Sequence, residues 1–312
     1  MTLLLQYTLL YAAVLILVGL GGMISERSGV INLGLEGIMV IGALAGALTL
    51  RACPEPTAWV MLLVVAVSAA AGVLYSLLLA VAANTFQADQ TLVGTGMNML
   101  ATAAATVLVK AMNTAADPTN VSSTVSFGPA SESLFIRIGN WSISWFSVIA
   151  LIALLIVGFT IKRTRFGLRL VSCGEHPHAA DSVGVNVNKM RYTGVMLSGI
   201  LGGIGGIAYI TAGVNEWQFE YGVAGFGYLA LAVMIFGQWK ALPIAGAALL
   251  FGILRSLTNV YTGIPFFESL GLPSMVYSIL PYLISLIVLA LTSKHSRAPK
   301  AEGIPYVKGE LS

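Results

Sequence analysis

Residues 164–208, TRFGLRLVSCGEHPHAADSVGVNVNKMRYTGVMLSGILGGIGGIA, decide how this chain is organised. The stretch begins as a polar, basic segment and ends as an apolar helix rich in glycine, whereas most of the sequence on either side is apolar. A basic segment that leads into a long apolar helix is typical of a loop between two membrane spans. The lipid bilayer is therefore the solvent in which the rest of the sequence has to be interpreted.

The polar part of this stretch carries the signals of a short helix. Pro177 suits the first turn and Gly184 suits the position after the end, so the residues between them can form about two helical turns. Ala179, Ala180 and Val183 then share a small apolar face. Small residues on a short exposed helix would let it sit in a groove of another protein, and an ordinary interfacial loop is the simpler alternative.

The composition supports a membrane protein. The chain has 312 residues, 57% apolar and only 9% charged, with a mean hydropathy of +0.88. A helix needs about 20 apolar residues to cross the hydrocarbon core. The segments that meet or approach this length are 4–23, 31–50, 58–82, 91–110, 144–161, 192–212, 224–239, 241–258 and 275–293. The sequence predicts an all-α polytopic membrane protein with about nine transmembrane helices; since the seventh and eighth segments are short and one could be re-entrant, the range is roughly eight to ten.

The distribution of Lys and Arg predicts the orientation of the chain. If the loop 162–191 is cytosolic, the cytosolic side collects 12 of the 16 basic residues, namely Arg27, Lys162, Arg163, Arg165, Arg169, Lys189, Arg191, Lys240, Lys294, Arg297, Lys300 and Lys308. The N-terminus is then outside, and the basic pI reflects topology rather than nucleic-acid binding. We expect a transmembrane domain over 1–293, a poorly ordered cytosolic tail over 294–312, and a short strand or hairpin near Leu134–Ser144 on the outer side.

The sequence gives little support for a metal site or a catalytic site. His176 and His178 supply two fixed ligands at most, whereas a structural zinc site normally has four, so no metal site is expected. Cys53 and Cys173 fall on opposite sides of the membrane in this topology and are not expected to pair. The sequence contains no Gly-x4-Gly-Lys-[Ser/Thr] phosphate loop, and we expect no enzyme activity in this chain.

Four blocks of the sequence resemble one family of transport proteins. They are ISERSGVINLGLEGIMVIGALAGAL at 24–48, QTLVGTGMNML at 90–100, the loop and glycine-rich helix at 164–206, and FGYLALAVMIFGQWKALPIAGAALLFG at 226–252. Together they resemble permease subunits of ATP-binding-cassette (ABC) importers, in the branch for nucleosides, simple sugars and branched-chain amino acids, and particularly its nucleoside permeases. The turn before the seventh span departs from the family's Gly-x-Gly-Phe character, because this chain has a longer Gly222–Gly227 turn.

The resemblance implies a type II ABC importer permease-like bundle in a bacterial inner membrane. It implies three partners: a second permease, expected to be a different, homologous chain, a cytosolic ABC ATPase, and an extracytoplasmic substrate-binding lipoprotein. ATP and Mg²⁺ would be held by the ATPase, and no cofactor by this chain. Within the coupling segment 162–191, the residues expected to dock on the ATPase are Gly174, Glu175, His176, Pro177, Ala179, Ala180, Val183 and Gly184. An importer of sugars or branched-chain amino acids is the alternative, and an ion-coupled secondary transporter is a further one.

Glu36 is the only acidic residue within a predicted span. A charged group inside a membrane is costly and is by default a functional candidate. Because Glu36 is predicted near the inner end of its span, within reach of Arg27 and of headgroup water, a structural ion pair or a helix anchor is the favoured interpretation. A gate or a substrate contact is the alternative.

Uncharged polar residues within the spans are the better candidates for a translocation pathway. They are Thr95, Asn98, Thr102, Ser198, Gln238, Ser256 and Asn259. Hydroxyl and amide groups would suit the sugar and base of a nucleoside. Intramembrane Asn and Ser also bond helices to one another, and many glycines in the spans are expected to let helices pack closely.

Overall fold

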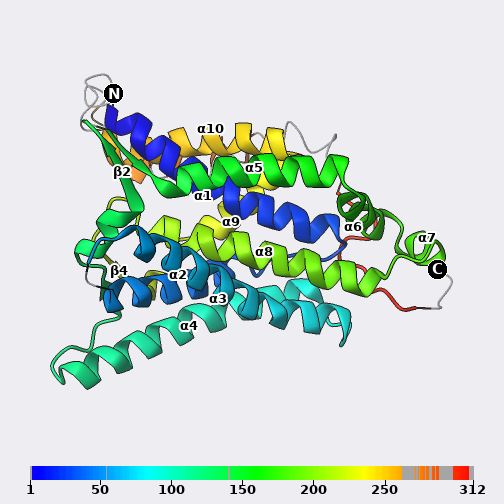
Figure 1. Cartoon of the computed structure of the whole chain (residues 1–312), viewed down its shortest axis with the longest axis horizontal. Helices are drawn as coiled ribbons and strands as arrows, with labels where there is room; N and C mark the ends of the chain where they lie inside the picture. The colour runs from blue at the N-terminus through cyan, green and yellow to red at the C-terminus, as the bar shows by residue number, and fades with distance from the viewer. Residues whose placement is uncertain are drawn as a thin grey trace.

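The computed structural model describes residues 2–53, 55–139, 141–261 and 298–308, with isolated positions between 271 and 287. It is a bundle of helices whose long axes run roughly parallel (Figure 1). The helices are α1 (Thr2–Arg27), α2 (Leu35–Ala52), α3 (Ala58–Asn84), α4 (Gln90–Ala116), α5 (Trp145–Arg163), α6 (Arg165–Glu175), α7 (Pro177–Ser182), α8 (Val187–Ile210), α9 (Phe226–Phe236) and α10 (Ala241–Val260).

Eight candidate membrane spans lie within the described residues, which confirms the all-α polytopic class. They are α1 without its first residue, α2, α3, α4, α5, α8, α10 and the stretch Phe219–Phe236 that contains α9. The ninth predicted span, 275–293, falls largely outside the described residues. Helix α9 has only 11 residues, so the regular helical part of the seventh span is much shorter than a full crossing.

Short strands cover the end of the bundle at which α1 begins. Strand β1 (Thr124–Ser126) pairs antiparallel with β4 (Glu216–Gln218), and β2 (Phe135–Ile138) pairs antiparallel with β3 (Trp141–Ser144). The second pair confirms the predicted hairpin. Two short 3-10 turns, Pro129–Leu134 and Phe219–Tyr221, complete this end.

The centre of the bundle is α8, whose glycines let α2 and α3 approach its backbone. A methyl group at Gly203 would collide with the carbonyl oxygen of Ser68 on α3, and one at Gly206 would collide with the carbonyl oxygen of Met39 on α2. A side chain at Gly42 of α2 would in turn strike Gly203. Small residues are what allow such close helix packing in a membrane, because lipid tails offer no hydrophobic force to drive helices together.

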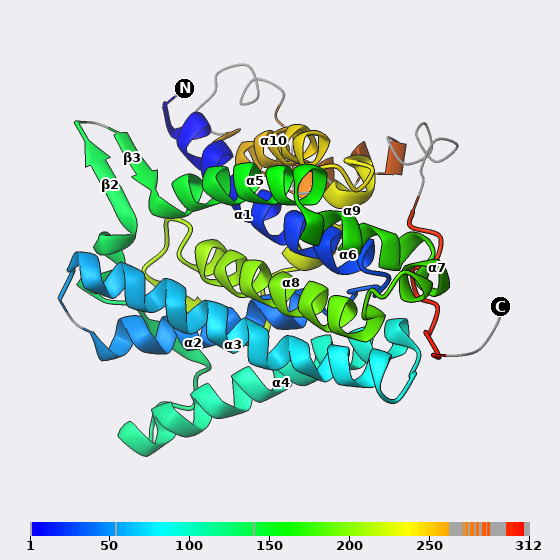
Figure 2. The ribbon, with the colours of Figure 1, turned by 45° about the vertical axis from the view of Figure 1, so that its right-hand side comes forward.

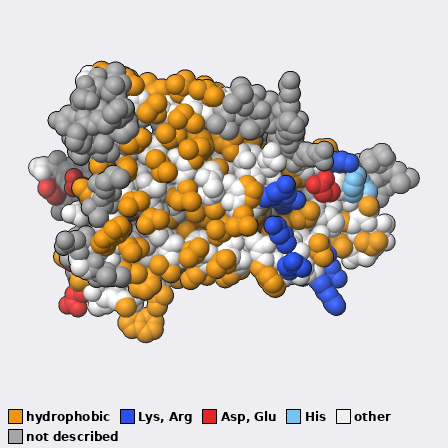
Figure 3. All heavy atoms as spheres, turned by 90° about the horizontal axis from the view of Figure 1, so that it is seen from above, with side chains coloured by type: hydrophobic (Ala, Val, Ile, Leu, Met, Phe, Trp, Pro, Cys, Tyr) orange, Lys and Arg blue, Asp and Glu red, His pale blue; other side chains and the backbone are white. Residues whose placement is uncertain are grey.

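Basic side chains gather at the opposite end from the strands, which we call the basic end. Hydrophobic side chains cover the middle of the visible face in Figure 3, and Lys and Arg lie toward one end. Arg27 closes α1 and Lys162 and Arg163 close α5, while α6 and α7 project beyond the ends of α5 and α8 (Figure 2).

The tail prediction was wrong for residues 298–308, which we call the strap. The strap lies against the basic end, with Ala301 donating its N–H to the carbonyl oxygen of Gly174 at 2.8 Å and Gly303 donating to that of Gly29 at 3.2 Å. Pro299, Ala301 and Tyr306 are buried. The polar composition of the tail suggested disorder, but its backbone finds partners on α6 and on the α1–α2 connection.

Candidate functional site

The first candidate site is the element formed by α6 and α7. Thr164 caps α6, its side chain accepting the N–H of Gly167 at 3.1 Å. Pro177 starts α7, and Gly184 follows its end with φ +82, a conformation that favours glycine. The short helix predicted from Pro177 and Gly184 is therefore present, at the tip of the basic end (Figure 2).

The predicted apolar face of α7 is split between two environments. Ala180 is buried, against Cys173, Val187 and Tyr306 of the strap. Ala179 is exposed and Val183 is 78% exposed. The expectation that Ala180 lies on the outward face was wrong, because the strap covers that side of the helix.

The other predicted docking residues also include both exposed and buried positions. His176 and Gly184 are exposed, and Pro177 and Glu175 are half-buried. Gly174 is buried, and a side chain there would strike the carbonyl oxygen of Arg27. The surface that α7 offers to a partner is therefore formed by His176, Ala179, Ser182, Val183 and Gly184, which we call the α7 tip.

Arg191 fastens the strap to the bundle and was missed as a structural residue. Its side chain is fully buried, and Nη1 donates to the carbonyl oxygen of Ile304 at 2.9 Å while Nη2 reaches that of Ala301 at 3.5 Å. The ring of Tyr306 lies 5.3 Å from that of His178 on α7. Sequence reasoning counted Arg191 only as one of the basic residues that set orientation.

A pair of carboxyl groups lies where the strap meets α1. Glu302 and Glu26 hydrogen-bond to each other, and Glu26 also accepts the indole N–H of Trp239 at 2.6 Å. A carboxylate can only accept a hydrogen bond, so the contact between the two acids requires a proton on one of them. Burial raises the pKa of Glu302 to about 7, against the lowering effect of its hydrogen bond with Glu26.

The second candidate site lies at mid-depth, where two helices begin inside the bundle. The turn after α9 is at the basic end, because Arg27 donates from Nε and Nη2 to the carbonyl oxygen of Trp239 at 3.1 and 2.8 Å. At 1.5 Å per residue, the 11 residues of α9 rise about 16 Å, so α9 begins near the middle of a core about 30 Å thick. Helix α2 begins beside it.

Glu36 joins these two helix starts. Its carboxylate accepts the N–H of Gly225 at 2.8 Å and that of Gly227 at 2.7 Å, at the N-terminus of α9. Of the two favoured interpretations, the ion pair with Arg27 was wrong, because Glu36 lies about 16 Å deeper than the end of α9 that Arg27 contacts, whereas these contacts fit a helix anchor. A carboxylate at a helix N-terminus satisfies backbone donors that have no partner within the helix, so part of its desolvation cost is offset.

Asn98 of α4 completes a group that we call the mid-depth cluster: Leu33, Glu36, Gly37, Asn98 and Tyr228. Its side-chain oxygen accepts the N–H of Gly37 at 2.8 Å, and its nitrogen donates to the carbonyl oxygen of Leu33 and to the hydroxyl of Tyr228, both at 2.8 Å. Irregular backbone at membrane depth is tolerated only where it is buried in protein or lines a cavity.

One side of the mid-depth cluster is open. The side chain of Tyr228 is 49% exposed, Thr102 is half-exposed beside Gly222, and Thr95 is exposed one turn from Asn98. Three of the predicted pathway residues, Thr95, Asn98 and Thr102, therefore follow one face of α4, and Asn98 joins that face to Tyr228. The sequence reading missed Tyr228, although an aromatic residue just after a glycine-rich turn in a span was a visible signal.

The remaining pathway candidates lie elsewhere. Ser198 accepts a hydrogen bond from Asn32 at 2.9 Å inside the bundle, and Asn259 donates to Tyr11 at 2.7 Å. Ser256 bonds to Thr8 at 2.8 Å. Gln238 is in the turn after α9, at the basic end rather than within a span. The contacts of Ser198, Ser256 and Asn259 indicate a role in helix packing, and the position of Gln238 indicates a role in a turn.

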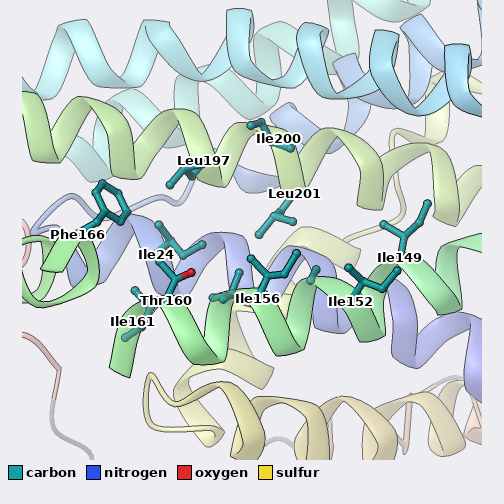
Figure 4. Close-up of a pocket in the computed structure, with 12 residues that line it drawn as sticks. Ile24, Ile149, Ile152, Ile156, Thr160, Ile161, Phe166, Leu197, Ile200 and Leu201 are labelled. Atoms are coloured by element: carbon teal, nitrogen blue, oxygen red, sulfur yellow. The ribbon is translucent and has the colours of Figure 1, made fainter. Parts of the chain in front are cut away.

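An apolar cleft of about 360 Å³ opens between α1, α5 and α8 (Figure 4). Aliphatic side chains such as Ile24, Ile156 and Leu201 line it, and among the described residues Thr160 alone brings a hydroxyl to the lining. Such a lining offers almost no partners for the hydroxyl and amide groups of a polar solute. The cleft is therefore a poor candidate for a polar translocation path. No group of three His, Cys, Asp or Glu able to hold a metal occurs within the part of the chain that the structure describes.

Comparison with known proteins identifies the family. Residues 4–290 match the family model described as branched-chain amino acid transport system / permease component. The guanosine ABC transporter permease protein NupQ of Bacillus subtilis is 39% identical over 97% of this chain and 96% of its own. The nucleoside ABC transporter permease protein NupC of Lactococcus lactis is 35% identical over the same shares, and the guanosine permease NupP of B. subtilis is 27% identical over 95% of this chain and 81% of its own. No solved structure matches. The chain thus belongs to the family of permease components of the branched-chain amino acid transport system type, as a multi-pass membrane subunit of an ABC importer.

Proposed function

We propose that this chain is a permease subunit that carries nucleosides into the cytoplasm. The observation that supports this substrate class most directly is the 39% identity, over nearly the whole chain, to a relative named for guanosine transport. The exposed side of the mid-depth cluster suits such a solute, since hydroxyl and amide groups can bond the sugar and Tyr228 can stack on the base. Simple sugars and branched-chain amino acids are the alternative substrates within the same family.

An ABC importer permease works with an ATPase and a substrate-binding protein. We infer further that its second permease is a different, homologous chain, as the two B. subtilis relatives NupQ and NupP suggest by both matching this sequence. The ATPase would hold ATP and Mg²⁺, and the binding protein would be an extracytoplasmic lipoprotein. The basic end would then be cytosolic in a bacterial inner membrane, with the N-terminus outside.

The α7 tip is the proposed contact with the ATPase. Val183 and Ala179 present small apolar side chains to solvent on a short helix, which suits insertion into a groove. Behind them, the strap, Arg191 and Ala180 hold α7 against α6 and α8. ATP binding can drive transport only if it favours one facing of the pore over the other, and a firmly seated α7 would transmit that preference.

Substrate uptake tests the proposal. The chain should be expressed with its candidate partner permease, ATPase and binding protein in a strain that lacks nucleoside uptake. We expect labelled guanosine to accumulate, with competition by other nucleosides and none by glucose or leucine. Accumulation of glucose or leucine without guanosine would replace the nucleoside with the sugar or amino acid alternative. A variant of the partner ATPase that cannot hydrolyse ATP is the control.

A further inference from the structure

The basic end contains a cleft that the transport function does not use. It has a volume of about 590 Å³ and lies between α1, α5, α6 and the turn that joins α9 to α10. Three cationic side chains line it, one from each of three elements: Arg27, Lys162 and Lys240. No acidic residue among the described ones lines it, although the carboxylate of Glu175 interacts electrostatically with Arg27 from outside the lining.

Of the three cations, the fold fixes Arg27 in place and leaves the two lysines exposed. The two hydrogen bonds of Arg27 to the carbonyl oxygen of Trp239 fix its guanidinium in place and leave Nη1 without a hydrogen-bond partner within the described residues. Lys162 and Lys240 are exposed, at the end of α5 and just before α10. Ser172 of α6 also lines the cleft, but its hydroxyl already donates to the carbonyl oxygen of Arg169 at 2.8 Å, so the three cations supply the donors. This set of donors suits a phosphate group.

What we call the seam is the run of positions on α5 and α10 that leads from this cleft to a second, apolar cleft. The second cleft of about 380 Å³ lies between α1, α5 and α10, lined on α5 by Ser147, Leu151 and Leu154 among others. Gly158, one turn further along α5, lines the basic cleft. These positions are spaced by three or four residues, so they lie on one face of α5. From Ser147 to Lys162 the helix rises about 22 Å, more than the depth of one leaflet core.

Helix α10 forms the other wall of the seam. Ala241 lines the basic cleft, and Ala245 and Leu249, at successive intervals of four, line the apolar one. The cleft in Figure 4, on the other side of α5, has no charged lining residue. The cations and the apolar seam therefore lie together on one side of α5 and not on the other. A free phosphate ion could bind the cations but would leave the seam empty.

We propose that the seam between α5 and α10 binds one anionic phospholipid. Its phosphate lies at Arg27, Lys162 and Lys240, and one acyl chain follows α5 from Gly158 toward Ser147. Basic pockets between helices at a membrane surface are suited to anionic headgroups. The bound lipid would bridge α1, α5, α6 and α10 at the end from which α7 projects.

Lipid retention tests the proposal. The chain with its partner subunits is purified in mild detergent, and phosphatidylglycerol that copurifies is counted by mass spectrometry. Lys162→Gln with Lys240→Gln should lower retained phosphatidylglycerol by about 5-fold or more. The matched control, Arg163→Gln with Arg165→Gln, removes the same charge from exposed residues at the same end that do not line the cleft, and should retain the wild-type amount.

A second variant and a competitor separate the lipid from a simple anion. Ala245→Phe should fill the seam and lower retention although no charge changes, whereas inorganic phosphate should not displace the lipid. Wild-type protein should also retain phosphatidylglycerol over phosphatidylcholine. Equal loss in the cleft and control variants would overturn the proposal, since general surface charge would then explain retention. Unchanged retention in Ala245→Phe, with displacement by phosphate, would overturn it in favour of an anion site without an acyl chain.

Discussion

At the scale of single residues, Gly203 shows how tightly the centre of the bundle is built. Its Cα faces Gly42 of α2 on one side and Ser68 and Gly72 of α3 on the other, so three helices meet at one position without a side chain. Gly96 of α4 is also helical, and a side chain there would meet nothing within 4 Å. The two glycines therefore differ in packing while sharing the same low helix propensity.

Replacing Gly203 by Ala should destabilise the bundle, because a methyl group collides with backbone that cannot move aside. Overpacking of this kind costs about 1–3 kcal/mol, or more where backbone must shift. Thermal unfolding in detergent should show a lower midpoint for Gly203→Ala than for the wild type. Gly96→Ala should leave the midpoint unchanged or raise it, and equal midpoints for the two variants would contradict the close packing described here.

Substitutions of Tyr228 test the proposed contact between the protein and the nucleoside base. Tyr228→Phe keeps the ring and loses only the hydroxyl that bonds Asn98, whereas Tyr228→Leu loses the aromatic face. Stacking of a base on an aromatic side chain is worth about 1–3 kcal/mol, so Tyr228→Leu should reduce guanosine uptake at low concentration by roughly 10-fold or more. Tyr228→Phe should retain most uptake. If both variants transport normally at wild-type protein levels, Tyr228 does not contact the base, while the nucleoside assignment itself is untouched.

At the scale of elements, α7 has two sides with different roles. Ala179→Arg places a charge on the exposed α7 tip, so the chain should fold normally but lose uptake and fail to copurify with the ATPase. Ala180→Arg places a charge among Cys173, Val187 and Tyr306, so it should disturb the element itself and lower the yield of folded chain. Asn188→Arg, on an exposed residue of α8 beyond the tip, is the control for added charge. Normal ATPase binding by Ala179→Arg would contradict the proposed docking surface.

The strap should respond to pH through Glu302. Because burial raises its pKa from 4.5 to about 7, the docked strap binds the proton more tightly than the released strap does. Docking is therefore favoured fully below about pH 4.5 and weakens as the pH rises through about 7. Hydrogen exchange of residues 298–308, compared between wild type and Glu302→Gln at each pH, measures this.

Wild-type protection of the strap should fall relative to that of Glu302→Gln between pH 5 and 8, since glutamine cannot ionise. Protection that falls equally in both proteins would show that Glu302 does not control docking. The backbone contacts of Ala301 and Gly303 do not involve the side chain of Glu302, so the comparison isolates the carboxyl pair formed by Glu302 and Glu26.

At the scale of the whole molecule, the two native cysteines differ in how readily they can be labelled to determine the orientation of the chain in the membrane. Cys173 is buried, and burial raises the pKa of its thiol to about 11, so little of the reactive thiolate is present at neutral pH. A membrane-impermeant maleimide should label Cys53 from outside intact cells and leave Cys173 unlabelled until unfolding. Ser182→Cys, exposed on α7, should be labelled only in inside-out vesicles when Cys53 is replaced by Ser. Labelling of both positions from the same face would overturn the proposed topology.

Much of this architecture could be predicted because it depends on residues that are close together in the sequence. Apolar length identified the spans, and Pro177 and Gly184 identified α7. The errors concern contacts between distant segments. The sequence predicts Glu36 near the inner end of its span, within reach of Arg27, whereas its partners are backbone N–H groups at Gly225 and Gly227.

The candidate site was predicted less completely than the fold for the same reason. An apolar stripe on α7 does not say which side another segment will cover, so Ala180 was placed on the wrong face. Composition predicts disorder for the strap because it shows only that a hydrophobic stretch is absent, and it carries no information about a buried Arg191 that binds backbone carbonyls. Of the pathway candidates, only those on α4 share a surface, since hydroxyl and amide groups that bond helices look the same in sequence as those that line a path.

The strap also has a consequence for the order in which the protein is made. Residues 174–184 leave the ribosome before α8, α9 and α10, yet the strap that covers Ala180 and bonds Gly174 follows all of them in the sequence. The α7 element is therefore complete only after the later helices have been inserted. A chain stopped before residue 298 would present an unfinished surface to the ATPase, so assembly of the transporter would select for chains that have been translated through the whole bundle.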